Sequence, residues 1–256
     1  MMKAVFFDVD GTIYSHKTNS VPESTLQALK KLREQGIQTF LATGRHFAEL
    51  DKLLMGKISF DGYVALNGQL CTDGEKNVVH GNPVQGENAA YLLSAFSKKE
   101  LPMLIVEKEK MYANLINEEV IRAQAAISTP LPQLGVYTGE PVYQFICYGG
   151  KELEEQLAQK IPDCKMTRWS PYGVDIISKT GGKAAGIRKM MEIYDLRREE
   201  VLAFGDGEND IEMLEFVGTG VAMGNAEDKV KAIADYVTAD IDDDGIWKAL
   251  KHFGIL

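Results

Sequence analysis

Cysteine is scarce in this sequence: only three of the 256 residues are cysteines. Cys71, Cys147 and Cys164 lie far apart and form no CxxC pair. An odd, scattered set of this kind indicates reduced thiols and excludes a disulfide framework as the basis of the fold. Since the sequence also shows no secretion signal, we expect a cytoplasmic protein.

Long apolar runs and an excess of basic charge are also absent. No stretch approaches the roughly 20 apolar residues that a membrane-spanning helix needs, and carboxylates soon interrupt the short run in MMKAVFFDVDG. Acidic residues outnumber basic ones by 37 to 28, which gives a formal net charge of −9. This charge disfavours nucleic acid and anionic membranes as partners. An anionic small substrate is still compatible, because a metal ion and a few basic groups can reverse the sign locally.

What the sequence does contain is an alternation of short apolar runs with amphipathic segments. In the N-terminal part it predicts strands at 4–9, 37–42 and 62–66 and helices at 22–35 and 46–55. After residue 183 it predicts strands at 201–204, 219–223 and 236–238 and helices at 184–194, 210–216, 227–233 and 244–252. This order predicts a doubly wound, mostly parallel, Rossmann-like α/β core.

The segment 82–181 has a different pattern. We expect helices at 88–98, 118–126 and 152–160, and strands at 103–106, 111–114, 143–148, 165–168 and 174–177. This mixture predicts an α+β domain inserted into a discontinuous core formed by 1–81 and 182–256. The runs Gly81-Asn82-Pro83 and Thr180-Gly181-Gly182 have the composition expected of the two connections.

The motif Asp8-Val9-Asp10-Gly11-Thr12 follows the first predicted strand. An ordinary acidic turn is the simple alternative, since Asp and Gly are common where strands end. However, carboxylates at i and i+2 repel one another unless a cation lies between them. Ligands of open α/β sheets also bind beyond the carboxyl ends of the strands. The motif therefore predicts a functional site.

A second acidic cluster, Gly205-Asp206-Gly207-Glu208-Asn209-Asp210, follows another buried strand. Asn209 or Asp210 could simply cap the next helix. The cluster also brings three acidic side chains and an amide to the same edge of the sheet as Asp8. Carboxylates at neighbouring strand ends suit Mg²⁺, whose remaining positions are filled by water and substrate phosphate. We therefore predict Mg²⁺ as the cofactor.

Two further segments offer groups that bind phosphate. In Leu41-Ala42-Thr43-Gly44-Arg45, the Thr43 hydroxyl and nearby backbone N–H groups can hold a phosphate oxygen. Alternatively, Thr43 is a plain helix N-cap. Lys183 stands at a predicted helix start, where the helix dipole disfavours a cation. It is either a solvated surface lysine or a charge balancer among the carboxylates.

Together these four segments resemble the haloacid dehalogenase superfamily of phosphohydrolases. Within it, the chain is similar to the Cof-type members of subfamily IIB, which carry the larger α+β cap (type C2B). The resemblance covers the whole chain in motif order, core pattern and cap position. It implies that Asp8 is the nucleophile and Asp10 the general acid/base. It also implies that Asp206 binds Mg²⁺ together with Asp8 and the backbone carbonyl of Asp10.

The same resemblance implies roles for the remaining candidates. The residues expected to bind phosphate are Thr43, Gly44, Lys183 and Asn209. Asp210 is expected to support the metal site without contacting the ion. The residues that are candidates for contact with the rest of the substrate are Arg45, Asn67, Arg168 and Asp175, with Tyr172 beside them. Pairing with Glu49 is an alternative for Arg45, and ordinary packing is an alternative for those in the inserted domain.

The expected reaction is Mg²⁺-dependent hydrolysis of sugar phosphates, nucleotides or cofactor phosphates through an aspartyl-phosphate at Asp8. Asp10 should begin protonated, donate to the leaving group and then accept a proton from water. Because free aspartate has a pKa of about 3.9, we expect neighbouring negative charge to raise the pKa of Asp10. We expect the inserted domain to close over the site.

Two alternatives stay open. A phosphosugar mutase of the same superfamily would keep these core residues and return the phosphate to a second hydroxyl group of the sugar. A non-catalytic phospho-acceptor domain would also surround a phosphorylated Asp with acids, a Thr and a Lys. Such domains are about half this length and lack an Asp two residues beyond the nucleophile. Neither the physiological substrate nor the choice between monomer and homodimer follows from the sequence.

Overall fold

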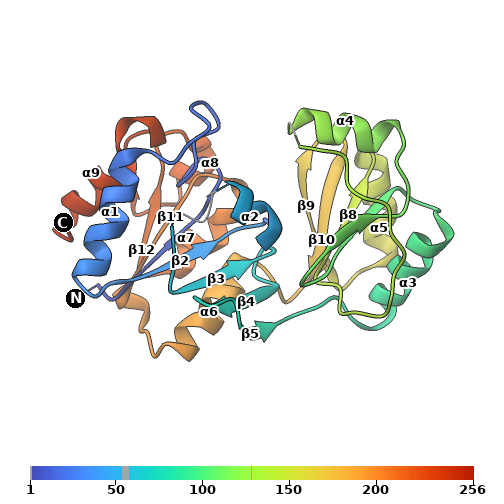
Figure 1. The fold of residues 1–256 in the computed structure, drawn as a ribbon, viewed down its shortest axis with the longest axis horizontal. Helices are drawn as coiled ribbons and strands as arrows, with labels where there is room; N and C mark the ends of the chain where they lie inside the picture. Colours follow the sequence, from blue (N-terminus) through green and yellow to red (C-terminus); the bar gives the residue numbers. More distant parts are fainter. Residues whose placement is uncertain (1, 54–57, 128) are drawn as a thin grey trace. The chain divides into compact units, whose positions relative to one another are not determined.

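The computed structural model describes residues 2–53, 58–127 and 129–256, and it divides into two compact units. The first unit consists of Met1–His80 and Gly182–Leu256, and the second of Gly81–Gly181 (Figure 1). Each unit has its own sheet and its own apolar core. The chain therefore leaves the first unit once, after His80, and returns to it at Gly182.

The first unit is built on an eight-stranded sheet with the order β13-β12-β11-β1-β2-β3-β4-β5. Its strands are β1 (Ala4–Phe7), β2 (Gln38–Ala42), β3 (Gly62–Ala65), β4 (Leu70–Asp73), β5 (Val78–Gly81), β11 (Val201–Gly205), β12 (Thr219–Ala222) and β13 (Tyr236–Val237). The strands from β13 to β3 pair in parallel, and β4 is antiparallel to β3. This topology confirms the predicted mostly parallel α/β core.

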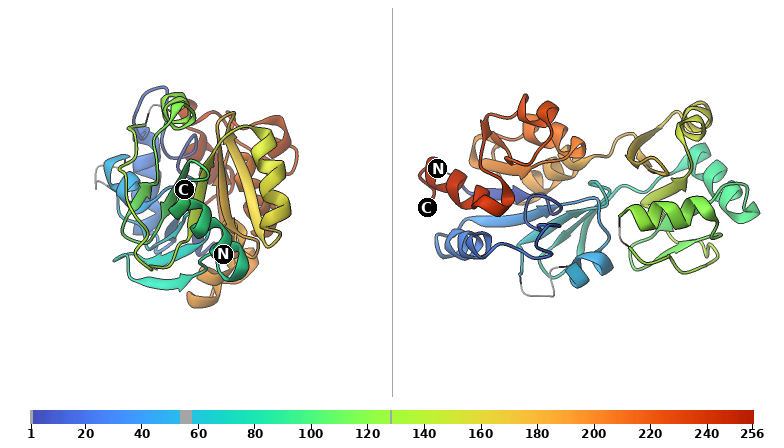
Figure 2. Two further views of the ribbon diagram at one scale, coloured as in Figure 1. Left: turned by 90° about the vertical axis from the view of Figure 1, so that its right-hand side faces the viewer. Right: turned by 90° about the horizontal axis from the view of Figure 1, so that it is seen from above.

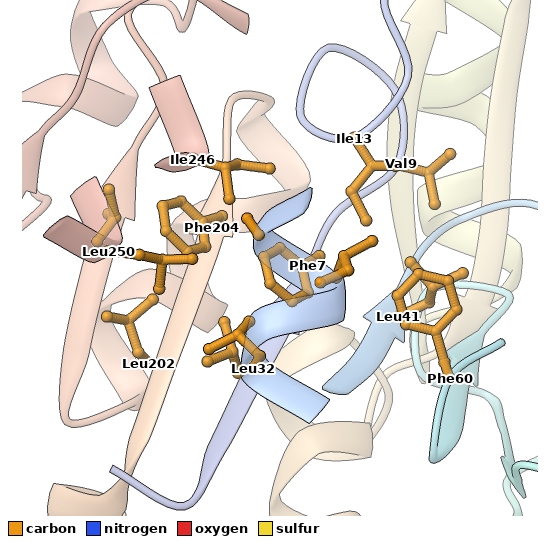
Figure 3. Packing of buried hydrophobic residues seen from close by; sticks show 14 of the residues in the cluster. Phe7, Val9, Ile13, Leu32, Leu41, Phe60, Leu202, Phe204, Ile246 and Leu250 are labelled. Atoms are coloured by element: carbon orange, nitrogen blue, oxygen red, sulfur yellow. The ribbon is translucent and has the colours of Figure 1, made fainter. Parts of the chain in front are cut away.

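Both faces of this sheet are covered, as the continuous apolar strands predict. Val5 and Phe7 of β1 pack on one face and Phe6 on the other, because successive side chains of a strand alternate. The helices on the first face are α1 (Glu23–Glu34), α2 (Phe47–Leu53) and α9 (Gly245–His252) (Figure 3). Those on the second face are α6 (Lys183–Ile193), α7 (Ile211–Phe216) and α8 (Asp228–Lys231).

Apart from shifts of one or two residues at the bounds of elements, the observed elements differ from the expected ones in two places. Strands β4 and β5 were not predicted, because each spans only four residues and β5 is largely exposed. Asp210 was predicted to open a helix, but it lies in the short 3₁₀ turn Glu208–Asp210 that precedes α7. The predicted helix 46–55 is observed as α2, and its predicted end at 54–55 lies outside the described residues.

The second unit contains a five-stranded antiparallel sheet with the order β7-β6-β8-β10-β9. Its strands are β6 (Met103–Val106), β7 (Met111–Ala113), β8 (Gln144–Tyr148), β9 (Cys164–Ser170) and β10 (Gly173–Ser178). Its helices are α3 (Gly86–Lys98), α4 (Glu118–Ala126) and α5 (Lys151–Lys160). Leu92 and Phe96 of α3 and Leu157 of α5 pack into one core with the sheet. Figure 2 shows the ribbon of the chain in two further views. This α+β unit is the predicted insertion.

Among the described residues, no helix is both long and apolar enough to cross a membrane.

Candidate active site

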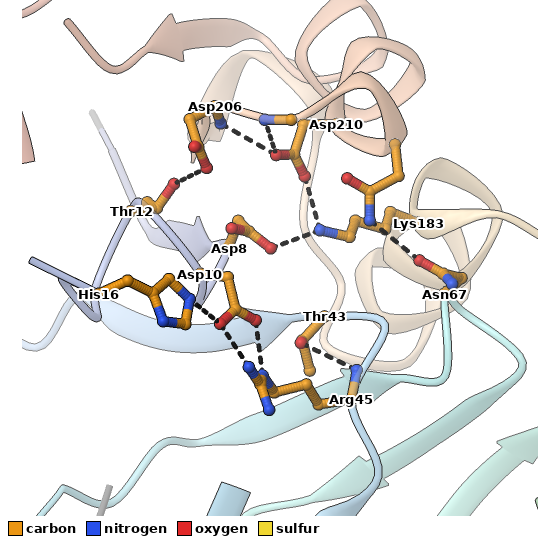
Figure 4. Close-up of polar contacts among 12 residues, drawn as sticks. Asp8, Asp10, Thr12, His16, Thr43, Arg45, Asn67, Lys183, Asp206 and Asp210 are labelled. Carbon is orange, nitrogen blue, oxygen red and sulfur yellow. Dashed lines mark hydrogen bonds and ion pairs between the residues drawn. The ribbon is translucent and has the colours of Figure 1, made fainter. Parts of the chain in front are cut away.

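The predicted motifs of the first unit meet at the carboxyl ends of its central strands (Figure 4). Phe7 of β1 lies beside Phe204 of β11 and Leu41 of β2 in the parallel register. The residues that follow these three strands therefore leave the sheet at the same edge. The backbone N–H of Asp8 continues the pairing by donating to the carbonyl of Phe204 at 3.0 Å.

Lys183 joins two of these segments. Its Nζ donates to Oδ1 of Asp8 at 2.5 Å and to Oδ1 of Asp210 at 2.6 Å, and its side chain is fully buried. Burial alone would lower the pKa of Lys183, but the charges of Asp210 and Asp8 outweigh it and raise the pKa. Lys183 is therefore a permanent charge inside the acidic cluster and not a solvated surface lysine.

The acidic cluster carries more negative charge than Lys183 can balance. Carboxylate oxygens of Asp8, Asp206 and Asp210 lie within 4.8 Å of one another. Burial, then the charge of Asp210, raise the pKa of Asp8 well above its usual range, although Lys183 opposes the shift. The same two causes raise the pKa of Asp206 to about 7. Hard oxygen ligands with an unbalanced charge fit a divalent cation such as Mg²⁺.

The hydrogen bonds of Asp210 leave it little capacity to bind such an ion directly. Its Oδ1 accepts from Lys183, and its Oδ2 accepts from the backbone N–H groups of Asp206 and Gly207 at 3.0 and 2.9 Å. Asp210 thus fixes the loop that carries Asp206. Asp8 and Asp206 are the other two carboxylates of the cluster, and their binding of Mg²⁺ stays a prediction.

Asp10 differs from the sequence-based expectation. Its Oδ2 accepts from Nε of Arg45 at 2.6 Å, and its Oδ1 accepts from Nη2 of Arg45 and contacts Nε2 of His16, both at 2.7 Å. Burial alone would raise the pKa of Asp10, but the hydrogen bonds and charges of Arg45 and His16 lower it. The predicted upward shift of the Asp10 pKa is therefore wrong for this state of the protein, because the groups nearest to Asp10 are Arg45 and His16 and not acids.

Arg45 also lies near Glu49, the partner that the sequence suggested, with Nη1 3.8 Å from Oε1. The bidentate pair with Asp10 is shorter and has better geometry. Sequence analysis missed this pair, because Asp10 and Arg45 lie 35 positions apart and meet only when β1 and β2 align. The Arg45 side chain thus lies in the site through its pair with Asp10, and its contact with substrate stays a prediction.

Thr43 is buried, and its hydroxyl accepts from the backbone N–H of Arg45 at 3.1 Å. Thr43 does not cap a helix, because α2 begins only at Phe47. In the first turn of α2, the backbone N–H of Ala48 donates to Nδ1 of His46. Gly44 lies so close to the Asn67 side-chain amide that an added Cβ would come within 3.1 Å of it.

Asn67, in the turn after β3, and Asn209, in the 3₁₀ turn after β11, contact one another. Nδ2 of Asn209 donates to Oδ1 of Asn67 at 3.2 Å. The backbone carbonyl of Asn67 accepts from the N–H of Gly182 at 3.0 Å, which ties the turn after β3 to the start of α6. Gly68, with φ of +81°, packs so tightly on Gly182 that an added Cβ would lie 2.1 Å from its carbonyl oxygen. These contacts fix the start of α6, which carries Lys183.

Arg168 and Asp175, two of the candidates in the second unit, have neighbours within that unit. Arg168 donates to Oε2 of Glu154 at 2.7 Å and to three backbone carbonyls of the same unit. Asp175 is half-buried on β10, opposite Thr167 of β9 and Ile146 of β8. The contacts of Arg168 favour the packing alternative, and substrate contact by either residue stays a prediction.

The structure also identifies site residues that the sequence analysis did not single out for a role. Thr12 donates from its hydroxyl to Oδ1 of Asp206 at 3.1 Å, and His16 contacts Asp10. Asn225, in the loop after β12, donates to Oδ2 of Asp206. Thr12 stands inside a motif that was recognised, but an isolated Asn or His carries no signal before the fold is known.

Comparison with known proteins agrees with this geometry. A family model described as haloacid dehalogenase-like hydrolase matches residues 5–250. "Putative phosphatase YkrA" of Bacillus subtilis (strain 168) is 35% identical, over 99% of this chain and 98% of its own length. The structure of BT1666 from Bacteroides thetaiotaomicron, described among phosphatases of the same superfamily, has a TM-score of 0.91 at 31% identity and covers 100% of this chain and 96% of its own. BT4131, described as a subclass IIB sugar phosphatase, has a TM-score of 0.84 at 36% identity and covers 100% of both chains.

Proposed function

This chain belongs to the haloacid dehalogenase-like hydrolase family as a Cof-type phosphatase, and we propose that it is a Mg²⁺-dependent enzyme that acts through a phosphorylated Asp8. The observation that carries the proposal is the buried Lys183, which contacts Asp8 and Asp210 beside the unbalanced carboxylate of Asp206. A phosphate monoester is a dianion and repels an attacking carboxylate, so such a site needs cationic groups before Asp8 can react.

In the first step, a carboxylate oxygen of Asp8 attacks the phosphorus, and the bond from phosphorus to the leaving oxygen breaks. Asp10 gives its proton to that oxygen. Lys183, the Thr43 hydroxyl and the adjacent backbone N–H groups would hold the other phosphate oxygens. In the second step, water attacks the phosphorus of phospho-Asp8, Asp10 accepts its proton, and the bond to Asp8 breaks to release inorganic phosphate.

The contacts of Asp10 explain how one carboxylate can serve both steps. In the free protein, Arg45 and His16 favour its ionised form, which is the form that accepts a proton from water. An incoming phosphate dianion would compete for Arg45 and would raise the pKa of Asp10, which favours the protonated form needed in the first step. Arg45 is thus proposed to position Asp10 and to respond to bound substrate.

Asp8, Asp206 and the backbone carbonyl of Asp10 are the groups proposed to hold Mg²⁺. The ion would neutralise phosphate charge and align the substrate. Asn67 and Asn209 are proposed to contact the phosphate side of the substrate from the opposite edge of the site. The second unit is proposed to act as the cap that selects the rest of the substrate. Sugar phosphates are the first class to test, because BT4131 is described as a sugar phosphatase; nucleotides and cofactor phosphates follow.

The test is a phosphate-release screen over a metabolite panel, with and without Mg²⁺, ranked by kcat/KM. We expect release of inorganic phosphate that depends on Mg²⁺ and is lost in Asp8→Asn. Hexose 1-phosphates belong in the panel, because formation of the 6-phosphate isomer without free phosphate would identify a mutase. Equal release with and without Mg²⁺ would contradict the proposed cofactor.

A further inference from the structure

Asn225 connects three segments around the acidic cluster. Its Nδ2 donates to the carbonyl of Gly11 at 2.8 Å and to Oδ2 of Asp206 at 3.3 Å. Its Oδ1 accepts from the backbone N–H of Ile241 at 3.0 Å. The reverse orientation of the amide would point its oxygen at a carbonyl and a carboxylate, so these partners fix the orientation.

The loop that carries Asn225 is held firmly on both sides. Met223 and Ala226 are buried, and the N–H of Gly224 donates to the carbonyl of Ala239 at 2.9 Å. A Cβ on Gly224 would lie 2.4 Å from the backbone nitrogen of Asp240, so this residue is packed directly against the neighbouring segment. The Asn225 amide is therefore presented to Asp206 by a rigid support and not by a loose chain.

The donors to Asp206 differ in kind from the donor to Asp8 and Asp210. The latter two share the ammonium group of Lys183. The two oxygens of Asp206 accept from a hydroxyl, that of Thr12, and from an amide, that of Asn225. Neutral donors orient a carboxylate without cancelling its charge. The negative charge of Asp206 thus stays available to a cation, while its direction is fixed.

Asn225 also acts on the loop that carries Asp8 and Asp10. Gly11 has a φ of +78°, and a Cβ at this position would lie 2.2 Å from Oδ2 of Asp206. The loop after β1 thus lies directly against Asp206, and Asn225 bonds to both sides of this contact. Loss of the amide would release the carboxylate and the Gly11 carbonyl together.

From these contacts we propose that Asn225 is a positioning residue for the divalent-cation site, which it completes by holding Asp206 against the loop of Asp8 and Asp10. The inference rests on the proposed function, in which Asp206 binds Mg²⁺. Partners that orient metal ligands in this way typically contribute about 10–100-fold to metal affinity. We expect a loss of that size when the amide is removed.

The experiment is calorimetric titration of the folded, metal-free full chain with Mg²⁺ alone. Asn225→Ala should weaken the Kd by about 10–100-fold, and the smaller change Asn225→Ser should weaken it in the same direction. Asn77→Ala is the matched control: Asn77 is also exposed and donates from Nδ2 to an aspartate Oδ2, that of Asp73, in a turn between β4 and β5. Its Kd should equal that of the wild type.

Thermal unfolding without metal distinguishes a positioning role of Asn225 from a purely structural one. If Asn225→Ala lowers Tm but binds Mg²⁺ as tightly as the wild type, the residue is only a structural brace and the inference is overturned. An unchanged Kd with an unchanged Tm overturns it equally. If the wild type itself binds no Mg²⁺, the proposed function fails first, so the two failures are distinguishable.

Discussion

The two units bury charged side chains in different ways. In the first unit, Lys183 faces a cluster of three carboxylates. Burial and then the charge of Asp210 raise the pKa values of Asp8 and Asp206, although Lys183 lowers both. In the second unit, Glu107 is also buried, but it accepts from the hydroxyl of Tyr112 at 2.5 Å and pairs with Lys110 at 3.4 Å. The first arrangement holds excess charge, and the second is balanced.

This difference follows from the two kinds of sheet. Parallel strands direct the residues that follow them to one edge, so Asp8, Thr43 and Asp206 converge although they are distant in sequence. The antiparallel sheet returns the chain at every turn and has no such edge. Its charged residues instead bond to nearby groups, as Arg168 does with Glu154. Excess buried charge is therefore found at the candidate active site, whereas the buried Glu107 of the second unit is paired with Lys110.

The largest expected effect is on turnover by Asp8→Asn. We expect a loss on the order of 10⁴ to 10⁶-fold in kcat, because the nucleophile is removed and the remaining groups cannot substitute for it. The fold should persist, since the substitution is isosteric and removes a buried charge. Steady-state kinetics and circular dichroism measure both outcomes. Asp163→Asn, at an exposed position of the second unit, is the matched change and should retain activity. Comparable losses in the two variants would contradict the distinction between units.

Lys183→Met should have the next largest effect. It leaves Asp8 and Asp210 buried without a counter-charge, and breaking a buried pair in this way costs about 3–5 kcal/mol of unfolding free energy. Lys179→Met, at an exposed lysine of the second unit, should change it by less than about 0.5 kcal/mol. Urea unfolding gives both values. A small effect of Lys183→Met would show that the site carries no excess charge.

The metal-free protein should lose stability as pH rises. The pKa of Asp206 is raised to about 7 in the folded state, against about 3.9 unfolded, so the folded state binds this proton more tightly. Its contribution is present below about pH 4 and is lost as pH rises to about 7, by up to roughly 1.4 kcal/mol per pH unit. Tm measured across this range tests the sign. Mg²⁺ should raise Tm more at pH 8 than at pH 5, and an equal gain would argue against a site of ionised carboxylates.

Arg45→Ala should shift the pH profile of kcat/KM. Removal of the guanidinium raises the pKa of Asp10, so the limb of the profile that reports Asp10 should move to higher pH. Arg45→Lys, which keeps the charge but not the bidentate geometry, should move it less. A profile that keeps its position in Arg45→Ala would exclude the pairing of Arg45 with Asp10 in solution.

Arg168→Ala should have the smallest effect on catalysis. Its bonds lie within the second unit, so we expect a loss of about 1–3 kcal/mol in the stability of that unit with little change in kcat. Comparing Tm and KM separates the alternatives. A raised KM with an unchanged Tm would assign Arg168 to substrate contact and weaken the contrast between the units.

Sequence reasoning recovered the features that depend on local pattern. The buried parallel strands were predicted from their apolar runs. Asp8, Asp10 and Asp206 lie in recognisable motifs at the ends of these strands. The features it missed depend on distant partners. The pKa of Asp10 was predicted in the wrong direction because Arg45 pairs with it across 35 positions. Asn225 was missed because one amide in a loop gains meaning only from its place beside Asp206.

The central claim is that Asp8 itself becomes phosphorylated. It is tested most directly by mixing the enzyme with Mg²⁺ and a turned-over phosphate ester, quenching with acid within one turnover and mapping peptides by mass spectrometry. The account predicts one added phosphoryl group on the peptide that contains Asp8, and none in Asp8→Asn. A single-turnover burst of product with no phosphoryl group on that peptide, or with one on another residue, would contradict it.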